Sequence, residues 1–188
     1  SFVKVTPSLK ENKDLVDVVF TINEGNKSYI NNISIIGNKR TADRVIRREL
    51  SFLEGDSFNK TKLTTSINSI KRLGYFTSVN YRIDRANEVN TVDIIIKVEE
   101  TNTGTVSFGV GYSSLNSASL TFGLNEKNFL GEGNKARFEA SITDKKSTYN
   151  IGFTEPYYLD KPIALSGNIF NEDSENKKGD IKASKFGF

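Results

Sequence analysis

Hydrophobic and polar residues alternate with a period of two along most of the second half of the chain. The alternation is clearest in four stretches after residue 103, where the intervening residues are small, polar or charged. The apolar positions are Val106, Phe108, Val110 and Tyr112; Leu120, Phe122 and Leu124; Phe138, Ala140 and Ile142; and Tyr149, Ile151 and Phe153. Because successive side chains of a strand point to opposite faces, the pattern predicts antiparallel strands with one apolar and one polar face.

A sheet of this kind is stable in two settings. In a soluble sandwich the apolar face packs against a second sheet. In a membrane barrel the apolar face meets lipid and the polar face lines the lumen. The periodicity by itself does not choose between them. About six strands fit before Phe188, whereas the smallest membrane barrels have about eight, so the second setting implies an incomplete barrel.

Two stretches between residues 26 and 101 have helical spacing. Thr41 is the expected N-cap of the first helix and Asn59 that of the second. The apolar positions of the two helices are Ala42, Val45, Ile46 and Leu50, and Leu63, Ile67 and Ile70. Gly74 is the expected helix stop. With strands expected at 33–38, 78–84 and 91–99, the order is β-α-α-β-β, and two helices can cover one face of a three-stranded sheet.

The first residues of the chain repeat a later segment. Val16-Asp17 and Val92-Asp93 are 76 positions apart, and the alternating apolar positions around them correspond one to one. A repeat of this length predicts a tandem array of one small unit, with residues 1–25 as the end of a preceding copy. The alternative is two unrelated amphipathic strands that share Val-Asp. Because the chain starts inside a strand pattern, we expect Ser1 to be a trimmed or processed end.

The amino-acid composition argues against several kinds of catalytic and metal sites. The chain has 188 residues and a formal net charge of +3, and it contains no Cys, His, Met or Trp. The usual nitrogen and sulfur donors of metal sites are therefore missing, as is the histidine of hydrolase triads. Nothing fixes the separation of carboxylates such as Asp144 and Glu155, so we predict no enzyme, no metal and no cofactor. The low net charge and the lack of a basic-aromatic array argue against nucleic acid, and no apolar run approaches about 18 residues.

Ten of the 14 glycines follow residue 103, which places a domain boundary near Thr103–Gly104, where we expect a hinge. Four segments before this boundary resemble a POTRA domain, the periplasmic repeat of outer-membrane barrel assembly proteins. These segments are Ile33-x-Ile35-x-Gly37-Asn38, Arg47-Arg48-Glu49-Leu50, Gly55-x-x-Phe58 and Leu73-Gly74-Tyr75-Phe76-x-x-Val79. The resemblance implies a complete α+β POTRA domain at 26–101, preceded at 1–25 by the last strands of another.

Three later motifs resemble the start of the barrel in BamA-type proteins, and they occur in that family's order. The motifs are Asn102-Thr103-Gly104 with Phe108-Gly109-Val110-Gly111-Tyr112, Asn128-Phe129-Leu130-Gly131-x-Gly133, and Phe153-Thr154-Glu155-Pro156-Tyr157-Tyr158. The resemblance implies that 102–188 is the first part of a truncated outer-membrane barrel, with POTRA domains in the periplasm. It implies a protein that folds and inserts unfolded outer-membrane proteins into the lipid bilayer, with accessory lipoproteins as partners.

The resemblance also suggests where substrate would bind. The first barrel strand would offer an unpaired edge to an incoming strand. Its residues are Thr105, Val106, Ser107, Phe108, Gly109, Val110, Gly111 and Tyr112. The glycines would make this strand easier to open, or they would only relieve crowding in the wall. A POTRA edge strand could add a substrate strand in the same way, or be an ordinary edge guarded by Arg82 and Arg85. Its residues are Ser78, Val79, Asn80, Tyr81, Arg82 and Ile83.

Arginines recur at 40, 44, 47 and 48, a spacing that predicts one stripe beside the first helix. Such a stripe could bind an acidic surface or anionic headgroups, or it could be a solvated face. The family resemblance implies an accessory lipoprotein contact, and the predicted residues are Arg44, Arg47, Arg48 and Glu49. Tyr157, Tyr158 and Phe129, at strand ends, could form an aromatic girdle or pack against a turn.

Two other functions stay open at this point. One is a relative with the same modules that serves as a translocation pore or in autotransporter assembly. The other is a soluble β-rich binding protein, which would remain monomeric in water without detergent, whereas a barrel segment would aggregate there.

Overall fold

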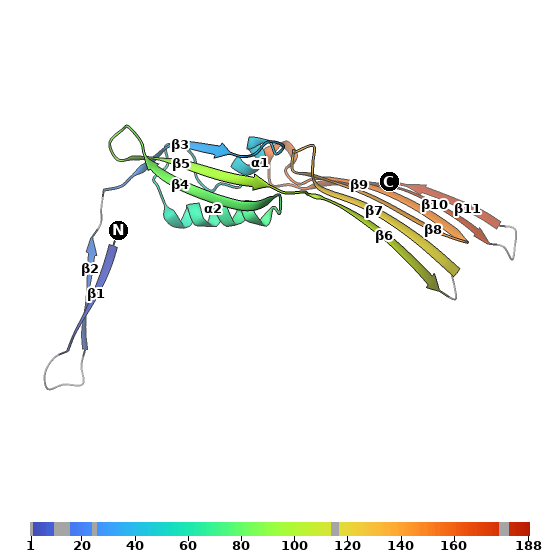
Figure 1. The fold of residues 1–188 in the computed structure, drawn as a ribbon, viewed down its shortest axis with the longest axis horizontal. Coiled ribbons are helices and arrows are strands. Elements are labelled where there is room, and N and C mark those ends of the chain that lie inside the picture. Colours follow the sequence, from blue (N-terminus) through green and yellow to red (C-terminus); the bar gives the residue numbers. More distant parts are fainter. Residues whose placement is uncertain (1, 10–15, 24–25, 114–116, 177–180) are drawn as a thin grey trace.

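The computed structural model describes residues 2–9, 16–23, 26–113, 117–176 and 181–188, and Figure 1 shows their arrangement. A two-stranded hairpin comes first, an α+β unit follows, and a long antiparallel sheet completes the chain. Parts of the segments predicted at 1–25 and 102–188 lie outside the described residues. Within the described part, no helix is both long enough and apolar enough to cross a membrane.

The α+β unit has a three-stranded sheet with the order β3-β5-β4 and two helices on one face. Its elements are β3 (Tyr29–Ile36), α1 (Asp43–Arg47), α2 (Lys60–Arg72), β4 (Phe76–Arg85) and β5 (Thr91–Glu100). Strand β5 runs parallel to β3 and antiparallel to β4. The predicted β-α-α-β-β order is therefore confirmed.

A single hydrophobic core lies between this sheet and its helices. The central strand β5 contributes Ile94, Ile96 and Val98, and all three are buried. The rest of the core includes Ile30, Ile33, Ile46, Phe52, Leu63, Ile67, Ile70 and Val79. The apolar positions at spacings of four and three predicted for the second helix are thus the residues that α2 buries.

Of the two predicted helix N-caps, one is confirmed and the other is wrong. Asn59 caps α2 as expected, because its side-chain oxygen accepts hydrogen bonds from the backbone N–H of Thr61 at 2.9 Å and Lys62 at 3.1 Å. The prediction that Thr41 caps the first helix is wrong. The N-cap of α1 is Ala42, which makes no side-chain cap. The Thr41 hydroxyl instead accepts a hydrogen bond from Asn128, 87 positions later.

Six antiparallel strands form the second sheet, in simple sequence order and without closing on themselves. They are β6 (Gly104–Ser113), β7 (Ser117–Phe129), β8 (Asn134–Thr143), β9 (Lys146–Glu155), β10 (Leu165–Asn176) and β11 (Ile181–Gly187). The predicted open antiparallel sheet of about six strands is confirmed.

The strand register places apolar residues beside one another across this sheet. Phe108 lies opposite Phe122, and Phe122 lies opposite Ala140. Phe138 lies opposite Ile151, which lies opposite Ile169. No layer covers this face in the part of the chain that the structure describes, and Phe108 is 73% exposed. A soluble sandwich would hide such a face under a second sheet, so the fold favours a lipid-facing wall.

The hairpin of β1 (Phe2–Leu9) and β2 (Val16–Asn23) repeats the register of β4 and β5. Val3 pairs with Ile22, and the positions 76 residues later, Val79 and Val98, are also paired. The same holds for the pair Leu9–Val16 and the pair Arg85–Val92. A shared register over the whole hairpin supports a true repeat over two unrelated strands that share Val-Asp.

Candidate functional site

The first strand of the six-stranded sheet lies at its edge. All eight residues predicted to pair with substrate, 105–112, fall in β6. Strand β6 is hydrogen-bonded to β7 on one side, and none of the described strands lies on the other. Its outer backbone N–H and C=O groups are therefore available to another strand. The apolar side chains of β6 are also well exposed, with Tyr112 at 83%.

The glycines of β6 lie where the neighbouring strand comes close. A Cβ atom on Gly109 would be 2.5 Å from the hydroxyl oxygen of Thr121, and one on Gly111 would be 2.8 Å from that of Ser119. Thr121 uses this space to donate a hydrogen bond to the carbonyl oxygen of Gly109 at 3.3 Å. These contacts support the explanation that the glycines relieve crowding between β6 and β7.

The two edges of the α+β sheet differ. Along β3, Ile30 exchanges backbone hydrogen bonds with Gly55 and Asp56 at 2.7 and 2.9 Å, and Arg47 donates to the carbonyl oxygen of Ile33 at 3.1 Å. The outer side of β4 has no strand partner among the described residues. The six predicted edge residues, 78–83, all fall in β4. Of the two edges, β4 is the one left open to strand addition.

The arginine stripe beside the first helix is not continuous. Helix α1 spans only Asp43–Arg47, so Arg40 lies before it and donates instead to the carbonyl oxygen of Thr101 at 2.9 Å. Arg47 is paired with Asp43 at 2.8 Å and Glu54 at 3.0 Å. The hydrogen bond to Asp43 raises the pKa of Arg47, although partial burial opposes it. The predicted stripe was wrong because it assumed a helix longer than the one that forms.

The other three predicted contact residues face the turns of the six-stranded sheet. Arg44 is ion-paired with Glu132, in the turn between β7 and β8. The guanidinium carbon of Arg48 lies 4.0 Å from the centre of the Tyr157 ring, and the Tyr157 hydroxyl donates to Glu49 at 3.0 Å. Tyr157 therefore packs against the α+β unit, which is the alternative to a girdle. A contact of Arg44, Arg47, Arg48 and Glu49 with a lipoprotein stays a prediction.

Buried hydrogen bonds join the α+β unit to the β7–β8 turn. The Asn128 side-chain N–H donates to the hydroxyl of Thr41 at 2.9 Å, and its oxygen accepts from the backbone N–H of Gly133 at 2.7 Å. The backbone N–H of Ala42 donates to the carbonyl oxygen of Gly131 at 2.9 Å. The Tyr75 hydroxyl donates to the carbonyl oxygen of Gly133 at 3.4 Å. The turn is therefore bonded to the backbone just before α1.

The linker between the two sheets is bonded on both sides. The backbone N–H of Thr101 donates to the carbonyl oxygen of Tyr75 at 2.9 Å, and that of Lys127 donates to Thr103 at 3.4 Å. The carboxylate of Glu100 accepts from the backbone N–H of Thr41 at 2.7 Å and of Arg40 at 3.1 Å. Burial favours the neutral acid, but these hydrogen bonds outweigh it and lower the pKa of Glu100. The linker is therefore hydrogen-bonded on both sides, and a hinge at Thr103–Gly104 stays a prediction.

Comparisons with known proteins match both units. Residues 28–101 match the POTRA model, described as a surface antigen variable number repeat, and residues 128–188 match the Omp85 superfamily domain. The outer membrane protein assembly factor BamA of Nitratidesulfovibrio vulgaris is 31% identical over 172 residues, which cover 88% of this chain and 22% of that protein. BamA of Neisseria meningitidis serogroup B is 27% identical over 187 residues, 99% of this chain and 24% of that protein.

The crystal structure of BamA from Haemophilus ducreyi lacking POTRA domains 1–3 superimposes with a TM-score of 0.84 at 32% identity, over 94% of this chain and 33% of that one. This chain is BamA-type. It spans about a quarter or less of the two curated relatives. CdiB from Acinetobacter baumannii shares the fold, with a TM-score of 0.52 at 15% identity over 93% of this chain and 33% of that one.

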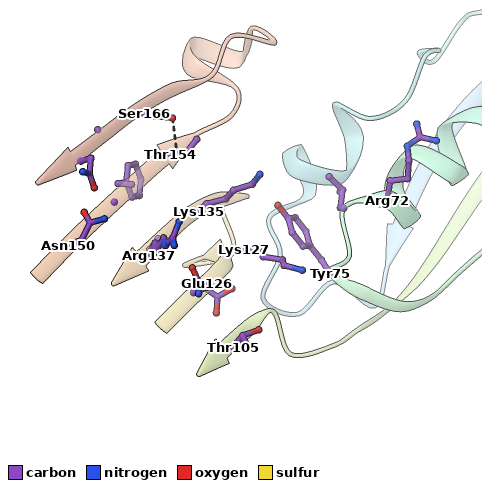
Figure 2. A pocket seen from close by; sticks show the side chains of 17 residues that line it. Arg72, Tyr75, Thr105, Glu126, Lys127, Lys135, Arg137, Asn150, Thr154 and Ser166 are labelled. Carbon is purple, nitrogen blue, oxygen red and sulfur yellow. Dashed lines mark hydrogen bonds between the residues drawn. The ribbon is translucent and has the colours of Figure 1, made fainter. Parts of the chain in front are cut away.

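In this BamA-type chain, a hollow of about 970 Å³ lies where the POTRA domain meets the polar face of the sheet (Figure 2). The charged side chains of its lining are mainly basic, and Arg72 and Tyr75 line it from the POTRA side. The sheet contributes Lys127, Lys135 and Arg137, and one carboxylate, Glu126. Within the described residues there is no group of three side chains of the kinds that hold a metal ion.

The junction residues are what the sequence prediction missed. Asn128, Gly131 and Gly133 were identified only as a turn motif, and Tyr157 only as an aromatic at a strand end. No signal in the sequence separated this motif from an ordinary turn, because asparagine and glycine are the residues that turns prefer. The identity of the partner surface could not have been found either, because it lies far off in the sequence.

Proposed function

We propose that this BamA-type chain takes part in folding β-barrel proteins and inserting them into the bacterial outer membrane. One observation carries the proposal: an unpaired strand edge, β6, borders a sheet whose apolar face is uncovered. The relatives named as outer membrane protein assembly factors support the same function. We place the six-stranded sheet in the outer membrane and residues 26–101 in the periplasm, with residues 1–25 as part of a preceding POTRA domain.

The mechanism follows from the cost of unpaired backbone groups in lipid. Each N–H or C=O group left without a hydrogen bond in the hydrocarbon region costs several kcal/mol. An unfolded outer-membrane protein that adds a strand along 105–112 of β6 satisfies one side of that strand before it enters the bilayer. The exposed apolar row on β6 continues the lipid-facing surface onto the new strand. No covalent step is required, and the chain needs no cofactor for it.

The POTRA edge would receive substrate earlier. A strand added along 78–83 of β4 would extend the three-stranded sheet on its open side. The solvent-facing Arg82, which is paired with Asp84 at 2.8 Å, leaves the edge backbone free. Accessory lipoproteins would bind beside α1, where Arg47 remains on the POTRA surface while Arg44, Arg48 and Glu49 also contact the sheet turns.

Disulfide trapping in the full-length protein tests the pairing at β6. This chain has no cysteine, so a Val110→Cys variant introduces a single reactive thiol in it. A barrel substrate would carry a cysteine in its terminal strand. We expect a mixed disulfide during assembly, because paired strands bring facing Cβ atoms within about 5.5 Å.

The matched control is Ala140→Cys on β8, a strand that is paired on both sides by β7 and β9. Equal trapping at both positions, or trapping at neither, would contradict pairing at the β6 edge. A photoreactive amino acid at Tyr81 in β4, compared with Ile95 in the central strand β5, tests the POTRA edge in the same way.

A further inference from the structure

We propose that Asn128 is a positioning residue that holds the POTRA domain at one orientation to the β7–β8 hairpin. Together with Thr41, Ala42, Gly131 and Gly133 it forms a set of contacts that we call the clasp. The clasp is separate from the strand edges discussed above. Its role in assembly rests on the proposed function, whereas its effect on geometry does not.

Asn128 has the environment of a structural connector. Its side chain is 9% exposed, although it ends a strand of a sheet whose other residues are largely exposed. Both ends of its amide are used, one toward Thr41 of the POTRA domain and one toward Gly133 in its own turn. Its partner Thr41 is 3% exposed. A buried amide with both ends satisfied fixes the relative position of the two groups that it joins.

The two glycines of the turn allow the approach. Gly131 has φ of +78°, and a Cβ atom there would be 2.0 Å from the carbonyl oxygen of Arg40. Gly133 has φ of +74°, and its Cβ would be 2.4 Å from a guanidinium nitrogen of Arg48 and 3.1 Å from a methyl carbon of Val45. A side chain at Gly131 would displace the POTRA backbone, and one at Gly133 would push the end of Arg48 aside and crowd Val45, so the turn is shaped to fit that surface.

A second turn, the one that follows β9, also contacts the POTRA domain. Tyr157 follows β9 and contacts Arg48 and Glu49 at the end of α1, while Glu132 in the first turn pairs with Arg44. The POTRA domain is thus held at two turns on the same end of the sheet, as well as through the linker. Contacts at separate points resist rotation as well as separation.

The position of the clasp has a consequence for the open edge. All of its sheet residues lie on β7 and in the β7–β8 turn, and none lies on β6. Strand β6 can therefore part from β7 while the POTRA domain stays attached to the β7–β8 hairpin. In that arrangement the β4 edge keeps its place relative to the wall while β6 moves to accept a strand.

The test measures orientation in the full-length protein reconstituted in lipid nanodiscs. Spin labels at Asn68→Cys on α2 and Asp144→Cys at the far end of the sheet report the distance between the two units by double electron–electron resonance. With the clasp intact we expect one narrow distance distribution. Asn128→Ala and Thr41→Val should each replace it with a broad one, whereas the control Asn168→Ala, on the polar face of β10, should not.

A charge exchange separates positioning from a general loss of folding. Arg44→Glu should broaden the distribution by opposing Glu132, and adding Glu132→Arg should restore the narrow peak. Unchanged distances in both Asn128→Ala and Thr41→Val, or no rescue by the charge exchange, would overturn the clasp. Disulfide trapping at Val110→Cys is measured alongside the distances so that the two proposals can be told apart. If the distance distribution is narrow, as expected for an intact clasp, but no substrate is trapped, only the proposed function is contradicted.

Discussion

The two sheets of this chain have the same alternation of apolar and polar residues, but the apolar face is buried in one sheet and exposed in the other. In the POTRA domain, Ile94 and Ile96 of the central strand are 0% exposed because two helices cover them. In the six-stranded sheet, Phe122 lies on an inner strand and is still 41% exposed. The difference shows that alternation marks a face that must be buried, whereas the neighbouring elements decide whether protein or lipid buries it.

The comparison predicts that a core truncation in the POTRA domain has the largest effect. Leu63→Ala leaves a cavity in a closed core and should lower the free energy of unfolding by about 2–5 kcal/mol. The matched change Leu124→Ala, on the exposed sheet face, should leave POTRA unfolding unchanged. Urea titration of residues 26–188 in detergent, followed at 222 nm, reports the helices of the POTRA domain. Equal losses for both variants would mean that the two faces are buried alike.

A charge on the wall tests the other half of the comparison. Phe122→Arg places a guanidinium on the apolar face near the middle of β7, which should cost about 2–4 kcal/mol in lipid. Thr121→Arg, the next residue on the polar face, should fold nearly as well as the parent. The fraction of full-length protein folded into vesicles can be measured by its gel mobility before and after heating. If Thr121→Arg were the more damaging change, the polar face would be the one that meets lipid.

Glu100 sharpens the comparison through pH, because its contacts lie within the POTRA domain. Its pKa is lower in the folded state, so its contribution to stability is present above the unfolded pKa and is lost as the pH falls through the folded pKa. Glu100→Ala should cost about 1–3 kcal/mol by leaving the N–H groups of Arg40 and Thr41 unpaired.

Urea unfolding of residues 26–101 between neutral pH and pH 3 measures both effects. In Glu100→Gln the free energy of unfolding should fall less between neutral pH and pH 3 than in the parent domain, since the amide does not titrate. An equal loss of stability with falling pH in Glu100→Gln and in the parent domain would contradict this role of Glu100.

The smallest expected effect is the loss of the α2 cap. Asn59→Ala removes the acceptor for the first N–H groups of the helix and should cost about 1 kcal/mol. Asn68→Ala, at an exposed position in the middle of the same helix, should be neutral or slightly stabilising, because alanine has the higher helix propensity. Thermal unfolding of residues 26–101 compares the two variants, and a larger loss for Asn68→Ala would contradict the capping role.

Much of each unit could be predicted because the relevant interactions are short in sequence. The burial of Leu63, Ile67 and Ile70 follows from their spacing, and the Asn59 cap involves residues two and three positions away. The length of α1 could not be predicted in this way. Thr41 is well placed in the sequence for a helix cap, and Arg40 for a stripe along the helix. In the structure, however, the backbone N–H of Thr41 donates to Glu100 and the Arg40 guanidinium donates to the carbonyl oxygen of Thr101.

By itself the sequence determined where the strands run, which side chains share a face and which edge strand follows the POTRA domain, since these depend on a period of two and on chain order. Only the tertiary structure decided that the two units are held together, because that depends on pairs such as Asn128–Thr41 and Tyr157–Glu49, 87 and 108 positions apart. A local pattern carries no information about which distant surface a buried amide or a glycine turn will meet.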